Sequence, residues 1–479
     1  MDAAVSLTAV SIEVRTGPRA IGKMRKNNLH QSFHLCVLVI GALLLLSLVP
    51  EFRVETLSFR KVNLLADVAP EVVDTAAVAF RDSLVVTQDS VKQLVKEVCP
   101  PGMTCIEDYS GDSTALHKFF DALAQLSEKP RAVRVAFYGD SFIEGDIFCG
   151  SLRDSLQATF GGRGVGFVPI TSQVAGFRYT IKHAFENWRT SSVINRTDST
   201  AEYGPAGYCF APLDGNWVEY RPVRRRFLRD FNTFKLYYKN YGNAVLKFSV
   251  NYDTAAKAIP LKQSKHLQEW TYRGRKLKSV RLAFNPHDSL HVFGASFEDG
   301  GGVYVDNFSL RGNSGISLSG VERGMFARFN QFRNYKLVIL QFGLNMVVED
   351  SLDYRGYVRR MVRVVNNLKK SFPQASFLLL SVSDRSTNSS GRFETMNAIP
   401  AMRNAQRLIA QRTGIAFWDM FEAMGGENSM VSFVHAKPSL AAKDYTHLNF
   451  RGGEKLSHLF LQSLLYSYNK HLEDHAALP

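Results

Sequence analysis

The sequence predicts a three-layer α/β fold built on a parallel sheet, interrupted by an all-β, sandwich-like insertion and preceded by an N-terminal transmembrane helix. Three observations lead to this prediction. Strand-like and helical segments follow one another over residues 116–180 and again over 301–479. Residues 181–300 instead carry short alternating β segments separated by turns. Residues 34–52 form a largely apolar segment near the N-terminus.

The composition is that of a folded globular protein with room for one to three domains. The chain has 479 residues, of which 45% are hydrophobic and 21% are charged. Its formal net charge of +14 favours anionic partners such as phospholipid, an acidic cell-wall polymer or nucleic acid. The sequence contains neither a zinc finger nor an RNA-binding signature, so we expect no nucleic-acid partner.

The N-terminal segment is expected to be an uncleaved signal-anchor. Basic residues outnumber acidic ones in residues 1–33, and the apolar run 35–49 is extended to about the length of a membrane span by its flanks, giving 34–52. A cleaved signal peptide would need a small-x-small site directly after Val49, which is absent, and the one-sided basic flank argues against a buried core helix. We therefore expect a cytoplasmic tail over 1–33, a single span in the cell (inner) membrane, and the rest of the chain on the extracytoplasmic or periplasmic side.

Residues 53–115 are expected to form a stalk or an N-terminal covering segment. Cys99 and Cys105 bracket a short loop rich in proline and glycine, and in an oxidising compartment its ends could close into a disulfide. Two reduced thiols on a loop are the alternative. No second pair of ligands follows at a suitable spacing, so a zinc site is not expected here.

The first strand–turn–helix unit lies within Val133–Phe160. Residues 133–138 are apolar and favour a buried parallel strand, Gly-Asp-Ser at 139–141 breaks it, and helical spacing begins near Asp146. A residue in such a turn is exposed at the carboxyl edge of the sheet, beside a helix N-terminus that favours negative charge. Ser141 is therefore a candidate nucleophile, although Gly-Asp-Ser alone is ordinary turn chemistry.

The inserted segment 181–300 is predicted to be a small antiparallel β-sandwich of carbohydrate-binding type. Its strand-like stretches are short, aromatic and β-branched, and Asn, Gly and Asp separate them. Trp188, Tyr203 and Trp270 could stack on sugar rings if they are exposed, although such residues more often belong to the core.

The α/β pattern returns after the insertion. The expected strands cover 303–310, 335–342, 376–382 and 415–419. The expected helices between them cover 354–371 and 402–413. Strands that alternate with helices imply a parallel sheet, so the loops after these strands gather with Ser141 at one sheet edge.

A serine at this edge becomes nucleophilic when a histidine takes its proton and a carboxylate orients the histidine. Asp444 and His447 lie three residues apart in the last loop, where they can meet each other while His447 faces Ser141. The sequence therefore predicts Ser141, His447 and Asp444 as catalytic residues.

An acyl-transfer site also needs hydrogen-bond donors at the developing oxyanion. We expect three: the backbone N–H of Ser141, the N–H of Gly312 and the side-chain amide of Asn345. Gly315 is an alternative to Gly312. A glycine is expected at this point because a side chain would block close approach.

Three motifs together resemble the SGNH (GDSL-like) hydrolase superfamily. They are Gly-Asp-Ser at 139–141, Gly-x-Asn at 343–345 and Asp-x-x-His at 444–447, in the order of the family's blocks. The glycine block is degenerate, which is why Gly312 and Gly315 both remain candidates. A β-rich insertion after the first block resembles the bacterial peptidoglycan O-acetylesterases. Phe142 departs from the family, because many relatives carry a small or polar residue there.

The resemblance implies an extracytoplasmic serine esterase that removes O-acetyl groups from a cell-wall or exported glycan, with peptidoglycan the expected substrate. It implies no metal or organic cofactor. The expected partners are the O-acetylated glycan and the membrane that holds the N-terminal helix. Two alternatives stay open: a glycan O-acetyltransferase that uses the same residues, and a non-catalytic glycan-binding or assembly protein.

Overall fold

The computed structural model describes residues 33–35, 37–39, 52–54, 57–59, 99–195, 201–285, 289–389 and 391–476. The chain divides into two compact units, Met1–Gln93 and Leu94–Pro479. In the first unit, β1 (Phe52–Val54) pairs antiparallel with β2 (Leu57–Phe59). The expected tail 1–33 and anchor 34–52 lie almost entirely outside the described residues. Among the residues that are described, no helix is long and apolar enough to cross a membrane.

The second unit is organised around a six-stranded sheet. Its strand order is β14 (Gly302–Ser309), β4 (Ala132–Gly139), β15 (Tyr335–Gln341), β16 (Ser376–Leu380), β19 (Ala416–Trp418) and β3 (Ile106–Asp108). The first five strands are parallel, and β3 joins antiparallel at the edge. The prediction of an α/β fold on a parallel sheet is therefore confirmed.

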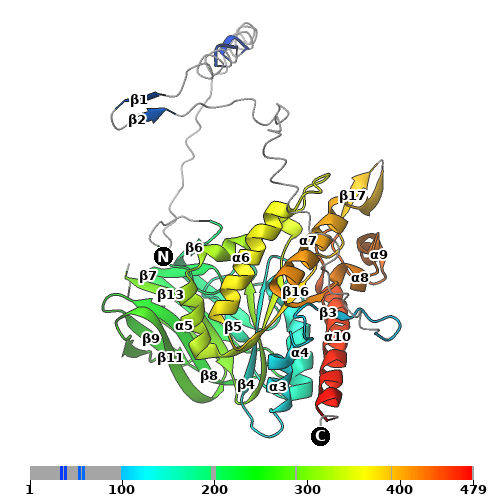
Figure 1. Cartoon of the computed structure of the whole chain (residues 1–479). Coiled ribbons are helices and arrows are strands. Elements are labelled where there is room, and N and C mark those ends of the chain that lie inside the picture. The colour runs from blue at the N-terminus through cyan, green and yellow to red at the C-terminus, as the bar shows by residue number, and fades with distance from the viewer. Residues whose placement is uncertain are drawn as a thin grey trace, which may run out of the picture. The chain divides into compact units, whose positions relative to one another are not determined.

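Helices cover both faces of this sheet (Figure 1). One group is α5 (Arg323–Arg333), α6 (Arg355–Ser371) and α7 (Ala398–Thr413); the other is α3 (His117–Ala124), α4 (Cys149–Phe160) and α10 (Phe450–Ala476). The alternation in β4 explains both layers: Ala136 and Tyr138 join the core of the first group, and Val135 and Phe137 join that of the second. A strand buried on both faces reads as a continuous apolar run, as it does here.

The stretch expected to be a stalk contributes to this sheet. β3 pairs with β19 through Ile106 and Trp418, and the indole Nε1 of Trp418 donates to the carbonyl of Thr104 at 3.2 Å. The expected disulfide between Cys99 and Cys105 is present just before β3. The α/β unit thus begins before residue 116, because these residues complete the edge that β19 would otherwise leave unpaired.

The inserted segment and β5, which precedes the predicted start at residue 181, form a single nine-stranded sheet in which all the pairs are antiparallel. The strands are β5 (Gly166–Val168), β6 (Lys182–Ser192), β7 (Tyr208–Arg221), β8 (Phe231–Asn240), β9 (Val245–Val250), β10 (Lys257–Pro260), β11 (Ser264–Leu277), β12 (Val280–Phe284) and β13 (Leu290–Glu298). Four strands separate β9 from β11 in the order, yet the ring of Phe248 lies 4.9 Å from that of Trp270. The sheet therefore folds over a shared core, as a sandwich-like insertion requires.

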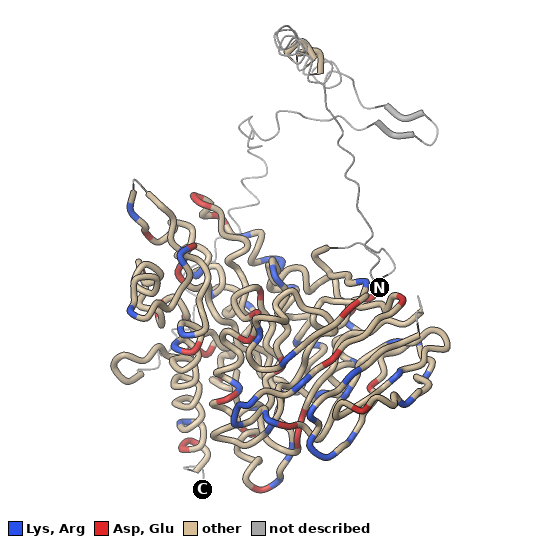
Figure 2. The backbone as a smooth tube through the Cα atoms, turned by 180° about the vertical axis from the view of Figure 1, so that it is seen from behind, with Lys and Arg blue, Asp and Glu red and all other residues tan. Residues whose placement is uncertain are grey.

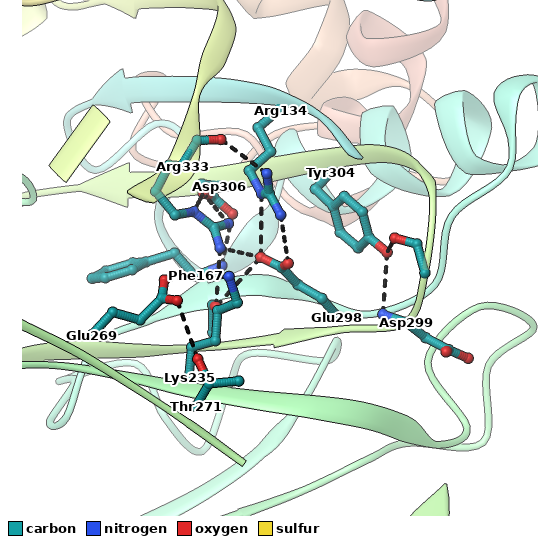
Figure 3. Close-up of polar contacts among 12 residues, drawn as sticks. Arg134, Phe167, Lys235, Glu269, Thr271, Glu298, Asp299, Tyr304, Asp306 and Arg333 are labelled. Atoms are coloured by element: carbon teal, nitrogen blue, oxygen red, sulfur yellow. Dashed lines mark hydrogen bonds and ion pairs between the residues drawn. The ribbon is translucent and has the colours of Figure 1, made fainter. Parts of the chain in front are cut away.

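A buried ion network fixes the insertion to the α/β sheet (Figure 3). Glu298 at the end of β13 accepts from Arg134 of β4 at 2.7 Å and also pairs with Arg333 of α5. Arg333 pairs in turn with Asp306 of β14 at 2.6 Å. Burial would raise the pKa of Glu298, but Arg333 and Arg134 outweigh it and hold that pKa well below its usual range. Paired charges are how such groups tolerate burial, so the two sheets meet in one arrangement.

Candidate active site

The turn that carries Ser141, the candidate nucleophile, follows directly from the end of β4. Gly139 lies in register with Ser309 of β14 and Gln341 of β15, so the loops after all three strands start at the same edge. A Cβ on Gly139 would lie 2.8 Å from the side chain of Ile143, which explains the glycine. The helix predicted from about Asp146 begins at Cys149, because 144–146 form a single 3₁₀ turn.

The structure brings the three predicted catalytic residues together. Oγ of Ser141 lies 3.3 Å from Nε2 of His447, and Nδ1 of His447 lies 2.7 Å from Oδ2 of Asp444. The chain separation between serine and histidine is 306 residues. Serine, imidazole and carboxylate in this sequence of contacts form the arrangement that activates a serine for acyl transfer.

The carboxylate of Asp444 also builds the loop that carries His447. Its Oδ1 accepts the backbone N–H groups of Thr446 and His447, each at 3.0 Å. Burial would raise the pKa of Asp444, but the hydrogen bonds from His447 and Thr446 outweigh it and lower that pKa. Asp444 is therefore ionised at neutral pH and can orient the imidazole and stabilise its protonated form.

The histidine–aspartate pair is open to solvent. The side chains of His447 and Asp444 are 47% and 49% exposed. The loop leads within three residues into α10, where Gly453 packs so closely that a Cβ would lie 2.2 Å from the carbonyl of Ile147. A rigid helix thus holds a loop that both a bulky ester and water can reach.

Asn345 lies at the carboxyl end of β15, in the 3₁₀ turn Leu344–Met346. Its Nδ2 donates to Oδ2 of Asp140 at 3.0 Å and to the carbonyl of Asn313 at 3.2 Å. The predicted oxyanion donor is therefore placed at the same edge as Ser141, with its amide held by two acceptors. To donate to an oxyanion, the amide has to give up one of these two hydrogen bonds. The bond to the carbonyl of Asn313 is the longer and therefore the weaker of the two.

The structure separates the two glycine candidates for the oxyanion hole. The N–H of Gly315 donates to Oδ1 of Asn313 at 2.7 Å, and a Cβ there would collide with Met361 and Phe342. Gly312 lies in an exposed turn with φ +76°, and no atom lies within 4 Å of the position of a Cβ. The space beside Gly312 is open, and its positive φ is a further reason for a glycine at this position. Because Gly315 is buried against Met361 and Phe342 while Gly312 is exposed, Gly312 is the better oxyanion candidate.

Two residues that sequence reasoning did not assign hold the site together. Asp140 is buried, and its Oδ1 accepts the N–H of Phe142 at 2.9 Å while Oδ2 binds Asn345. Burial raises the pKa of Asp140 to about 7, against the opposing effects of the Phe142 N–H and His447. Asn313 is also buried and links Gly315 to Asn345. Asp140 lies inside the Gly-Asp-Ser motif and Asn313 directly follows Gly312, so their positions in the sequence could have indicated a role at the site.

Phe142 packs into the core directly after Ser141. Its side chain is buried, and its ring lies 6.2 Å from that of Phe148 in the core beneath the turn. The departure from the family at this position is therefore accommodated inside the fold.

A pocket adjoins the nucleophile turn at the junction with the insertion. Gly145, Asn307 and Ser309 line it from the α/β unit, and Tyr208 and Arg178 are among the residues that line it from the other side. Its lining does not include Ser141, Asp444 or His447. It lies near Ser141 along the chain, since Gly145 follows that serine by four residues.

The comparisons with known proteins support the fold. No protein-family model matches the sequence, and no curated protein matches it. The chain is similar to the solved structure of a peptidoglycan O-acetylesterase, with a TM-score of 0.62 and 19% identity over 76% of this chain and 99% of that one. This similarity shows that the chain shares the fold of that solved structure.

Two further solved structures align less well. A Bacillus subtilis protein aligns with a TM-score of 0.29 and 13% identity over 60% of this chain and 90% of that one. An acetyl xylan esterase aligns with a TM-score of 0.26 and 16% identity over 34% of this chain and 80% of that one. Both TM-scores are too low to establish a shared fold.

Proposed function

We propose that the chain is a serine esterase of SGNH type that removes O-acetyl groups from a cell-wall or exported glycan, with peptidoglycan as the substrate. The observation that carries the proposal is the contact of Ser141 with His447 and of His447 with Asp444, at the carboxyl edge of a parallel sheet. Ester hydrolysis is the chemistry that such a relay performs without a metal or an organic cofactor.

In the proposed reaction, Oγ of Ser141 attacks the acetyl carbonyl while its proton passes to Nε2 of His447. The N–H groups of Ser141 and Gly312 and the amide of Asn345 bind the oxyanion. Collapse of this intermediate expels the glycan hydroxyl, which takes the proton from His447 and leaves acetyl-Ser141. His447 then deprotonates a water molecule, whose attack releases acetate and frees the serine. Asp444 holds the imidazole in the required tautomer throughout.

A glycan substrate fits the surroundings of the site. The alignment with a peptidoglycan O-acetylesterase covers 99% of that protein and 76% of this chain. That share of this chain is larger than the six-stranded sheet and its helices alone, so the alignment also includes residues of the insertion. Lys and Arg recur along the strands and turns of the insertion (Figure 2). They include the exposed run Arg224, Arg225 and Arg226. A basic surface on the insertion favours a polymer with carboxylates, as peptidoglycan is.

An extracytoplasmic location is part of the same proposal. The apolar segment 34–52 supplies a candidate anchor, with a basic segment before it. The disulfide between Cys99 and Cys105 adds support, because such bonds persist in oxidising compartments.

The proposal is tested by measuring acetate released from O-acetylated peptidoglycan by the full-length chain in detergent. Wild type is compared with Ser141→Ala and with Ser127→Ala, whose serine is exposed and belongs to none of the motifs. We expect release by the wild type and by Ser127→Ala, and none above background by Ser141→Ala. Equal release by Ser141→Ala would refute the nucleophile.

Further assays on the same protein preparation identify the substrate and distinguish the esterase from the two alternative functions. Cleavage of a small acetyl ester without release of acetate from peptidoglycan would support the serine mechanism and show that the substrate is a different glycan. Transfer of acetyl to an added sugar acceptor, in preference to water, would establish the transferase. Glycan binding with no turnover of any ester would establish a binding protein.

A further inference from the structure

A cluster of three histidines lies at the far end of α10 from the catalytic loop. His117 begins α3, and His471 and His475 lie in the last turns of α10. Ring centroids are 4.5 Å apart for His117 and His471, and 4.2 Å apart for His471 and His475. One ligand nitrogen from each ring can be chosen so that all three lie within 4.8 Å of one another. The three rings therefore face a common point between two helices.

The spacing on both helices puts each pair of residues on one face. His471 and His475 are four residues apart on α10, and His117 and Asp121 are four residues apart on α3. Residues four apart lie on the same face of a helix. Oδ1 of Asp121 lies 2.9 Å from Nε2 of His471 and 3.8 Å from Nε2 of His475. Two packed helices thus offer three imidazoles to one point, and the carboxylate of Asp121 holds Nε2 of His471.

One ring nitrogen of His471 is available to bind a further group. Its residue is only 5% exposed, and its Nδ1 is buried without a hydrogen-bond partner in the part of the chain that the structure describes. A buried polar atom without a partner is costly, and a metal ion is one of the groups that can supply the partner.

We propose that Nδ1 of His471, together with one ring nitrogen each of His117 and His475, binds a divalent transition-metal ion, Zn²⁺ by preference, at a site that joins α3 to the end of α10. Asp121 holds the other nitrogen of His471 from outside the metal shell, and a water molecule completes the tetrahedral shell of three imidazoles. Ligands at about 2.0–2.1 Å from zinc in that geometry lie roughly 3.3 Å apart, so the side chains close in slightly on binding.

The site serves the fold and takes no part in ester cleavage. α10 has 27 residues, so about 40 Å separate its two ends, with the catalytic loop before its first residue and the cluster in its last turns. The metal holds the end of a helix that packs on α3 and α4, and the other end of that helix carries the loop with His447. This inference does not depend on the esterase proposal.

The test measures zinc bound to the full-length chain after chelation and dialysis, by isothermal titration and elemental analysis, together with the shift in Tm. Variants are His117→Ala and His475→Ala, and the matched control is His458→Ala, an exposed histidine on the same helix. We expect one Zn²⁺ per wild-type chain and a rise in Tm on loading. His458→Ala should behave as wild type, and each cluster variant should bind at least roughly tenfold more weakly.

Binding of Co²⁺ adds a readout that does not depend on stability, because tetrahedral Co²⁺ absorbs strongly in the visible range. That absorption should appear in wild type and be lost in His475→Ala, whose side chain is half exposed and can be removed without disturbing the fold. Retention of equal zinc affinity by both cluster variants, or no metal bound by the wild type, would overturn the proposal.

Discussion

The side-chain amide of Asn345 donates a hydrogen bond to the carboxylate of Asp140 at 3.0 Å, which joins the end of β15 to the end of β4. The other oxygen of the same carboxylate accepts the N–H of Phe142, inside the turn that presents Ser141. One buried acid therefore positions both the proposed nucleophile and a proposed oxyanion donor.

Asp140 should make stability depend on pH between about 4 and 7. Its pKa is about 7 in the folded chain, raised by burial from an ordinary value of 3.8. A raised pKa contributes stability that is complete below the unfolded pKa and is lost as pH rises through the folded one. Thermal melts should show wild type losing stability relative to Asp140→Asn over this range. Parallel pH profiles for the two proteins would contradict the assignment.

Asn345→Ala should reduce kcat for ester hydrolysis by roughly 10²–10³-fold, because one oxyanion donor is lost. KM should change little, since the donor acts mainly on the charge that develops after attack. Asn366→Ala, at an exposed position on α6, is the matched control and should retain wild-type kinetics. A large rise in KM at unchanged kcat would show that Asn345 binds the ground state instead.

Asp444→Asn should lower kcat by roughly 10²–10⁴-fold, because an amide neither fixes the tautomer of His447 nor stabilises its charge. The asparagine oxygen can still accept the N–H groups of Thr446 and His447, so Tm should change little. Steady-state kinetics and a thermal melt on the same sample check both parts. Unchanged kcat would remove Asp444 from the relay.

Glu298→Gln should destabilise the chain by about 3 kcal/mol or more, because it leaves the buried Arg134 without its carboxylate and weakens the pairing of Arg333. The matched control is Asp353→Asn, which removes an exposed ion pair with Arg355 and should leave Tm unchanged. Chemical unfolding monitored by tryptophan fluorescence compares the three proteins. Equal effects of the two substitutions would contradict the role given to the buried network.

Local patterns were enough to predict the framework of this protein. The buried strand 133–138, the turn at Ser141 and the alternation of strands and helices after residue 301 follow from hydrophobic period and turn chemistry, which depend on near neighbours. The parallel sheet then required Asn345, Asp444 and His447 to lie at the edge that carries Ser141, and the structure places them there.

Features that depend on distant partners could not be predicted in the same way. β3 is only three residues long, and its role comes from pairing with β19, more than 300 residues later. Arg333 is charged and would be expected at the surface, yet it is fully buried between Glu298 and Asp306. Asp140 and Asn345 are 205 residues apart. Their contact is a consequence of the completed sheet.

The nucleophile is tested most directly by covalent labelling of the full-length chain with a fluorophosphonate, followed by peptide mapping. Such a probe reacts with a serine hydroxyl only where a neighbouring base activates it. The structure predicts one adduct per chain, on the peptide that carries Ser141, with none in Ser141→Ala and strongly slowed labelling in His447→Ala. Ester hydrolysis that persists while Ser141 stays unlabelled, or an adduct on a different serine, would contradict the proposed mechanism.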